Sequence, residues 1–235
     1  MLNYGRNIVK SALAYTPAMQ YRKSFALNDL DKKLEPFIGR KNGVFIEAGA
    51  NNGIRQSNTL YYEKYFGWKG ILIEPIPELY QQCKINRPQC NVVNAALVAN
   101  DYPDETVEMT FCGLMSTTAG AMNSEIQRET HIESGRRFLS EIQDVYNINV
   151  KARTLSSILD AFGIKEIDLL SLDIEGYEPM AMMGLDLTRH SPKFLLIEVR
   201  HIHREEIDHI LEKTHHPIAQ LTMLDDHSDV LYAIK

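Results

Sequence analysis

Short apolar runs alternate with amphipathic segments along most of the chain. The runs are typical of buried strands, several end in an acidic residue, and they lie at 44–47, 71–74, 91–94, 167–173 and 194–199. Segments with helical spacing lie at 59–66, 77–86 and 205–214, and a short helix is expected from Pro179. This alternation predicts an α/β fold with a largely parallel sheet and helices on both faces.

The end of the chain predicts a different pairing. Two further apolar runs, 218–224 and 230–234, are joined by the short polar link 225–229. Strands joined so briefly must be antiparallel neighbours, because a parallel pair needs a long crossover. We therefore expect seven strands, mostly parallel, that end in a C-terminal antiparallel hairpin.

The alternation breaks between residues 100 and 153. A strand is expected at 106–111, and a helical stripe is formed by Phe138, Leu139, Ile142, Val145 and Tyr146. We predict that 100–153 is an inserted cap, which either covers the core or recognises the substrate.

The first residues also predict a separate element. A helical face is formed by Ile8, Val9, Ala12 and Leu13. It either packs on the domain or acts as a lid or membrane-touching helix. We expect an N-terminal helical extension over 1–40 and one domain over 41–235.

Composition excludes several protein classes. The 235 residues are 44% hydrophobic and 24% charged, as in an ordinary globular chain. The formal charge of −6 argues against a non-specific nucleic-acid binder, which needs a basic surface. No apolar run approaches the roughly 20 residues of a membrane span. The three cysteines, Cys83, Cys90 and Cys112, have no metal-type spacing, so we expect reduced thiols and a cytoplasmic protein.

The first candidate motif follows the strand at 44–47. It reads Glu-Ala-Gly-Ala-Asn-Asn-Gly over residues 47–53, and it lacks both the G-x-G-x-x-G spacing and the Lys of a P-loop. A carboxylate at Glu47 suits a cationic ligand, and the N–H groups of the turn suit a ligand carboxylate. The alternative is a tight strand-to-helix turn without a ligand.

Acidic residues mark the ends of two later strands. Glu74 ends its strand where a carboxylate can accept hydrogen bonds from ribose hydroxyls. Asp173 ends another strand, just before the turn at Gly176, and we expect it to hold substrate or cofactor or to act as a base. Glu175 and Glu178 are expected to serve as charges at a helix N-terminus.

Histidines gather late in the chain. His201 follows the strand that carries Glu198, and it is either part of a polar helix entry or a general base beside Asp173. These three residues could also form a site for a divalent metal such as Mg²⁺ or Mn²⁺, which we do not favour. His215 and His216 precede Pro217 and are expected at a helix end.

The motifs, taken in order, resemble those of the FkbM-type S-adenosylmethionine-dependent methyltransferases. The matching stretches lie at 47–53, 56–59, 67–75, 171–178 and 228–232, with Glu47 where the family usually has Asp. The resemblance implies a class I, Rossmann-like methyltransferase fold and S-adenosylmethionine as cofactor. It implies that residues 47–53 surround the methionine part, that Glu74 binds the ribose, and that Asn94 and Ala95 lie near the adenine. The implied cofactor-binding residues are Glu47, Gly49, Ala50, Asn51, Asn52, Gly53, Ser57, Glu74, Pro75, Asn94, Ala95 and Asp173.

The expected activity is O-methylation of a sugar or natural-product hydroxyl, with Asp173, Glu198 and His201 as the catalytic residues. The partner would be a small-molecule or glycan acceptor, with no nucleic acid and no membrane span, and a homo-oligomer is left open. The alternatives are N-methylation of a peptide side chain and a binding module that kept the fold without activity. A nucleic-acid methyltransferase is disfavoured because Asp-Ile-Glu-Gly stands at 173–176 in place of an Asp/Asn-Pro-Pro-aromatic motif. A nicotinamide oxidoreductase disagrees with both the loop spacing and the antiparallel end.

Overall fold

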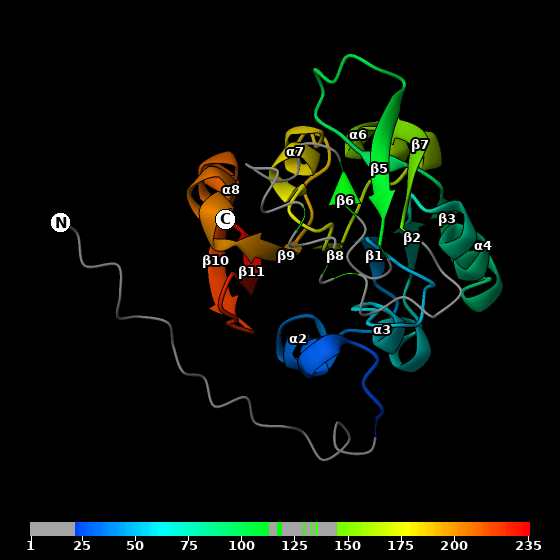
Figure 1. The fold of residues 1–235 in the computed structure, drawn as a ribbon. Coiled ribbons are helices and arrows are strands. Elements are labelled where there is room, and N and C mark those ends of the chain that lie inside the picture. Colours follow the sequence, from blue (N-terminus) through cyan, green and yellow to red (C-terminus); the bar gives the residue numbers. More distant parts are fainter. Residues whose placement is uncertain (1–21, 113–116, 119–128, 130–132, 134, 136–144) are drawn as a thin grey trace.

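A seven-stranded sheet forms the centre of the computed structural model, which describes residues 22–112, 117–118, 129, 133, 135 and 145–235 (Figure 1). The strand order is β10-β11-β9-β8-β1-β2-β3, and only β11 runs against its neighbours. The strands are β1 (Val44–Ala48), β2 (Lys69–Ile73), β3 (Asn91–Val93), β8 (Leu169–Leu172), β9 (Phe194–Arg200), β10 (His215–Gln220) and β11 (His227–Ile234). The predicted mostly parallel sheet with an antiparallel end is confirmed.

Helices cover both faces of this sheet (Figure 1). One face packs against α6 (Leu155–Phe162), α7 (Glu178–Met183) and α8 (Arg204–Leu211), and the other against α2 (Leu30–Ile38) and α3 (Leu60–Phe66). Neighbouring strand residues alternate between the faces, so Phe45 joins one apolar cluster and Ile46 the other. A strand buried on both faces reads as a continuous apolar run, which is why the runs predicted these strands.

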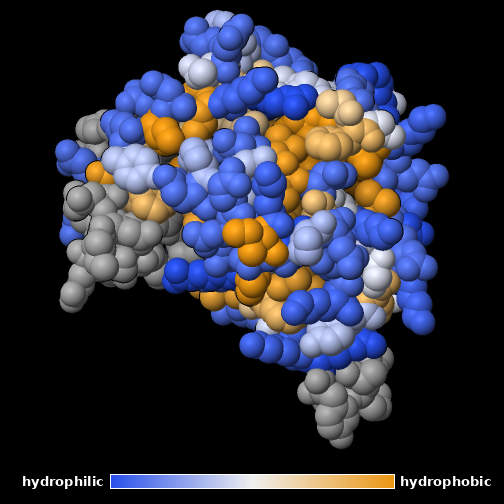
Figure 2. All heavy atoms as spheres, turned by 90° about the vertical axis from the view of Figure 1, so that its right-hand side faces the viewer, coloured by the Kyte–Doolittle hydropathy of each residue, from blue (hydrophilic) through white to orange (hydrophobic). Residues whose placement is uncertain are grey.

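Helix α4 (Pro77–Asn86) lies beside β3 at one edge of the sheet, and it has the bounds expected from the sequence. Its buried member is Cys83, and Ile85 is 77% exposed. Hydrophobic side chains reach the surface among hydrophilic ones on the face drawn in Figure 2. Helix α4 therefore contributes little to the apolar core, and its C-terminal end is instead used at the site described below.

A second, smaller sheet has the order β4-β7-β5-β6. Its strands are β4 (Ala96–Leu97), β5 (Thr106–Phe111), β6 (Thr117–Thr118) and β7 (Tyr146–Arg153). The strand at 106–111 was expected, but the placing of Tyr146 on a helical stripe is wrong, because it begins β7 and pairs with Phe111. Apolar and polar residues alternate strictly from Tyr146 to Arg153, which is the period of a half-buried strand.

His215 and His216 do not end a helix, since both lie in β10, where His215 pairs with Ile234 of β11. The helical face of residues 8–13 and the part of the stripe at 138–142 lie outside the described residues. The division into an extension over 1–40 and a domain over 41–235 stays a prediction. In the part of the chain that the structure describes, no helix is long and apolar enough to cross a membrane.

Candidate functional site

A cavity opens at the carboxyl ends of the central strands, where parallel α/β sheets bind ligands. Its empty volume is about 820 Å³, part of which is open to solvent. The ends of β1, β2 and β8 contribute Ala48, Ile73, Glu74 and Asp173, and Tyr177 lies between β8 and α7. The second sheet contributes Ala96, Leu97 and Met109.

Half of the residues predicted to bind the cofactor line this cavity. They are Gly49, Asn51, Glu74, Pro75, Ala95 and Asp173. The other half do not line it and lie behind or beside the lining: Glu47, Ala50, Asn52, Gly53, Ser57 and Asn94. Asn94 contacts the lining, because its side-chain amide donates to the carbonyl oxygens of Glu74 and Pro75 at 2.9 and 2.7 Å.

Gly49 lets the end of β1 pass close to the end of β8. Its φ is +79°, and a Cβ there would lie 1.8 Å from the carbonyl oxygen of Asp173. Only glycine fits this position without moving the backbone. The N–H groups of Gly49 and Ala50 both donate to the carbonyl oxygen of Ile73, which fixes the loop against β2 as well.

Glu74 is the buried acid of the cavity wall, with 4% of its surface exposed. Its two carboxylate oxygens accept hydrogen bonds from the backbone N–H of Asn51 and Ile76, at 2.8 and 2.9 Å. Burial raises the pKa of Glu74 to about 8, and these two hydrogen bonds act against that rise. A carboxylate has about four acceptor sites, so two remain for hydroxyl donors in the cavity.

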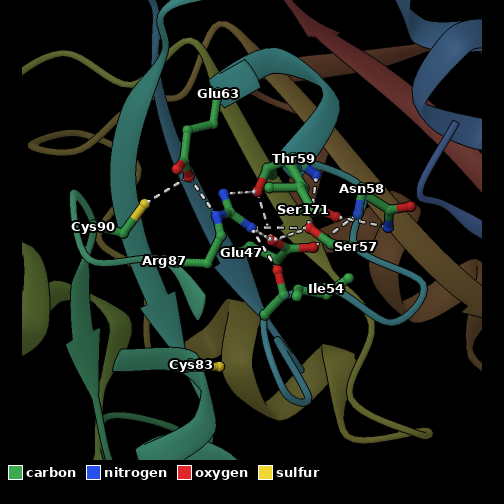
Figure 3. A network of polar contacts seen from close by, with 12 residues as sticks. Glu47, Ile54, Ser57, Asn58, Thr59, Glu63, Cys83, Arg87, Cys90 and Ser171 are labelled. Atoms are coloured by element: carbon green, nitrogen blue, oxygen red, sulfur yellow. Dashed lines mark hydrogen bonds and ion pairs between the residues drawn. The ribbon is translucent and has the colours of Figure 1, made fainter. Parts of the chain in front are cut away.

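Glu47 holds the loop from behind. Its carboxylate accepts hydrogen bonds from Ser57 Oγ at 2.9 Å, from Asn58 N at 2.8 Å and from Thr59 Oγ1 at 2.5 Å (Figure 3). The side chain is 5% exposed, and a guanidinium nitrogen of Arg87 lies 3.7 Å away. All of these partners belong to the chain itself, so the geometry gives Glu47 a role in shaping the loop.

Arg87 is a fully buried cation that the sequence reasoning missed. It follows α4 directly and is 0% exposed. Its guanidinium donates to the carbonyl oxygen of Gly53 at 3.0 Å and to Ser57 Oγ and Thr59 Oγ1 at 3.2 Å (Figure 3). It also forms an ion pair with Glu63, whose carboxylate accepts a hydrogen bond from Cys90. No periodicity or spacing in the sequence indicates these contacts.

The C-terminal part of α4 and the residue that follows it bind three consecutive carbonyl groups of the glycine loop. Cys83 Sγ donates to Asn51 O at 2.8 Å, and the Asn86 amide donates to Asn52 O at 2.8 Å. Arg87 completes the set at the carbonyl oxygen of residue 53, as described above. The peptide groups that follow residues 51, 52 and 53 are therefore held with their oxygens toward α4.

Carboxylates gather at the ends of β8 and β9. Burial, together with the negative charges of Asp229, Glu178 and Glu47, raises the pKa of Asp173 to about 7. Burial also raises the pKa of Glu198 to about 11, together with the charge of Asp173. Asp229 lies opposite Glu198 in the register of β9 and β11, which places like charges side by side.

The turn between β8 and α7 keeps two further acids near Asp173. Glu175 has a φ of +60° and accepts a hydrogen bond from Arg200 at 3.3 Å. Glu178 begins α7 and accepts from the N–H of Ile174 and Gly176, at 2.9 and 3.1 Å. Glu178 thus caps the turn at the helix start, as its expected position implied.

The predicted catalytic residues are not joined in one contact. Of Asp173, Glu198 and His201, only Asp173 lines the cavity. His201 is exposed, and its Nε2 lies 3.4 Å from Ser228 Oγ. Glu198 lies 3.5 Å from His227 Nε2, a neighbour that the sequence did not indicate. Among the described residues, no group of three or more His, Cys, Asp or Glu side chains is arranged to hold a metal ion.

Several solved methyltransferase structures are similar to this chain at low identity. A TehB-like SAM-dependent methyltransferase from Corynebacterium glutamicum is 10% identical with a TM-score of 0.45, over 88% of this chain and 87% of that one. Methyltransferase FkbM from Methylobacillus flagellatus is 15% identical with a TM-score of 0.48, over 82% of this chain and 43% of that one. A SAM-dependent methyltransferase from Aquifex aeolicus is 12% identical with a TM-score of 0.43, over 88% of this chain and 89% of that one.

Family membership comes from the sequence. Comparison with curated proteins gives no match. The family model described as "Methyltransferase FkbM domain" matches residues 47–231, which include the whole site described above. The strand order and the antiparallel β11 are those expected of a class I methyltransferase. The chain therefore belongs to the FkbM methyltransferase family and has the fold of S-adenosylmethionine-dependent methyltransferases.

Proposed function

We propose that this protein transfers a methyl group from S-adenosylmethionine to a hydroxyl group of a sugar or natural product. The observation that carries the cofactor assignment is Glu74, a buried carboxylate on the cavity wall that retains acceptor capacity for two ribose hydroxyls. Beside it, Pro75, Leu79, Ala95 and Leu97 line the cavity with apolar surface that suits an adenine ring.

The charges of the lining also fit this cofactor. S-adenosylmethionine carries a sulfonium and an ammonium group, and the cavity wall contains the carboxylates of Glu74, Asp173 and Glu175. Opposite charges within a few ångströms stabilise each other strongly where water is excluded. When bound, the cofactor supplies an electrophilic methyl group at the sulfonium.

Asp173 is our candidate for the general base. An acceptor hydroxyl must lose its proton as its oxygen attacks the methyl carbon, and a base with a pKa near the working pH does this best. The raised pKa of Asp173, about 7, is in that range. This step contributes roughly 10²–10⁴-fold to a rate. Holding cofactor and acceptor in line contributes more, about 7–11 kcal/mol in well-oriented systems.

The first test is cofactor binding, measured by isothermal titration calorimetry with S-adenosylmethionine. We expect Glu74→Ala to weaken binding about 10–100-fold, because hydrogen bonds to a charged acceptor contribute about 1.5–3 kcal/mol. Glu166→Ala removes an exposed carboxylate outside the cavity and serves as the matched control, with unchanged affinity. No binding by the wild type, or equal binding by Glu74→Ala, would contradict the cofactor assignment.

The acceptor class needs a separate measurement. Mass spectrometry of reactions with panels of sugars, natural-product alcohols and peptides should detect a gain of one methylene unit on oxygen. A product methylated on a peptide nitrogen would replace the O-methylation proposal by its alternative. A protein that binds the cofactor and methylates no member of the panels would favour a binding module.

A further inference from the structure

The glycine loop has no free backbone N–H between residues 49 and 55. Each of these N–H groups has an acceptor within the chain, at 2.7–3.2 Å. The acceptors are the carbonyl oxygens of Ile73 and Ala50, the carboxylate of Glu74 and the side-chain oxygens of Asn51 and Asn52. A ligand carboxylate was expected to accept hydrogen bonds from these N–H groups, but none of them is left as a donor.

The loop is also fixed against reorientation. Turning a peptide group to present its N–H would break the hydrogen bond that its carbonyl oxygen accepts from Cys83, Asn86 or Arg87, at the C-terminal end of α4 and just after it. On the other side, Gly49 contacts the end of β8 with no room for even one added carbon atom. A bound carboxylate must find its donor in a side chain.

One cationic side chain is available in the described part of the cavity wall. Arg55 lines the cavity together with Gln56, and both are exposed. The other charged residues of the described lining are Glu74, Asp173 and Glu175, and no described carboxylate forms an ion pair with Arg55. The described lining thus combines three carboxyl side chains with one guanidinium that has no described carboxylate partner.

These side chains are complementary to the amino-acid end of S-adenosylmethionine. The sulfonium and ammonium groups of the cofactor suit the carboxyl side chains of the cavity. The carboxylate of the cofactor suits a guanidinium, which binds carboxylates through two parallel N–H donors. We propose that Arg55 binds the carboxylate at the amino-acid end of S-adenosylmethionine, in the place that the loop N–H groups cannot fill. This assignment rests on the proposed function and names a residue that the motif reading did not select.

The experiment compares two ligands that differ in this carboxylate. S-adenosylmethionine has it, whereas 5′-methylthioadenosine keeps the adenosine and lacks the whole amino-acid end. We expect Arg55→Gln to weaken S-adenosylmethionine about 10–100-fold, the loss of a charge-assisted hydrogen-bonded pair, and to leave 5′-methylthioadenosine unchanged. Arg55→Lys, which keeps the charge without the paired donors, should give an intermediate loss for the first ligand.

Lys69→Gln is the matched control, since Lys69 is an exposed cation at the opposite end of β2. Neither affinity should change in it. Equal S-adenosylmethionine affinity in Arg55→Gln and wild type would overturn the Arg55 assignment, as would equal losses for both ligands. A wild type that binds neither ligand would instead overturn the proposed function, and the Arg55 assignment with it.

Discussion

Arg87 illustrates how one side chain can determine the shape of a binding loop. A buried charge is costly unless it is paired and hydrogen-bonded. Arg87 meets both conditions, with Glu47 and Glu63 as its anionic partners and Gly53, Ser57 and Thr59 as its acceptors. The side chain thereby connects the end of α4 to the loop that precedes α3.

We expect Arg87→Met to lower the free energy of unfolding by about 3–5 kcal/mol, because it leaves Glu47 and Glu63 buried without their cation. Urea denaturation measures this loss. Arg189→Met is the matched control: Arg189 also pairs with two carboxylates, Asp160 and Asp186, but it is half exposed. Solvent screens that second pair, so its loss should be much smaller. Similar losses of stability in the two variants would show that the buried ion pairs of Arg87 stabilise the fold no more than the exposed ion pairs of Arg189 do.

The sequence predicted the positions of single site residues better than their contacts. Gly49, Glu74 and Asp173 follow apolar runs, and the rule that carboxyl ends of parallel strands face the ligand brings them to one cavity. The same rule places Glu47 at a strand end, yet its carboxylate lies behind the loop, because Ser57 and Thr59 fold back onto it. The orientation of Glu47 depends on contacts with residues ten or more positions away, which no local sequence pattern indicates.

At the scale of elements, the approach of the β1 end to the β8 end depends on Gly49. We expect Gly49→Ala to cost several kcal/mol of stability, because its Cβ would overlap the carbonyl oxygen of Asp173 and push the loop away from β8. The displacement should also abolish binding of S-adenosylmethionine. Thermal melts and calorimetry measure the two effects.

Gly163→Ala is a control that separates the cost of backbone strain from the cost of atomic overlap at Gly49. Gly163 also has a positive φ, +63°, but a Cβ there would meet no atom within 4 Å. Its substitution should therefore cost only the left-handed backbone penalty, about 1–2 kcal/mol, and leave cofactor binding intact. If both glycine variants lost stability equally and both bound the cofactor, the close approach of the two strand ends would not matter.

Elements were predictable where one periodicity was undisturbed. The inner strands β1, β8 and β9 are largely buried, and each was found from its apolar run. The edge strand β10 is exposed or half-buried after His215, and it begins and ends earlier than the run at 218–224 predicted. Strand β7 was obscured because the stripe assigned before it continued at helical spacing into Tyr146. Helix α6 was not expected, although its end signals are clear in the structure: Thr154 accepts a hydrogen bond from Ser157 N, and Gly163 ends the helix in the left-handed conformation.

For the whole molecule, the net charge of −6 matters less than its distribution. Buried acids concentrate at the carboxyl ends of β2, β8 and β9, and burial raises the pKa values of Glu74, Asp173 and Glu198 to about 8, 7 and 11. The reference values are 4.5, 3.8 and 4.5. Between the reference pKa and the raised pKa of each acid, the folded state binds more protons than the unfolded state. The free energy of unfolding therefore falls as pH rises through that range.

This distribution predicts that the ligand-free protein becomes less stable from pH 7 to pH 9. Glu74 loses its proton in this window, and Glu198 stays protonated only in the folded state, so the loss should reach about 4 kcal/mol. His215 acts in the opposite direction, because burial lowers its pKa, but its effect on stability is complete above the reference value of 6.5.

Urea denaturation at pH 7, 8 and 9 measures the slope of the free energy of unfolding against pH. Glu198→Gln should flatten it and be more stable than the wild type at pH 9, whereas Glu166→Gln, exposed on the surface, should leave it unchanged. A wild type that gains stability from pH 7 to pH 9, or a Glu198→Gln variant with an unaltered slope, would mean that these acids are solvated and paired well enough to ionise in the folded protein.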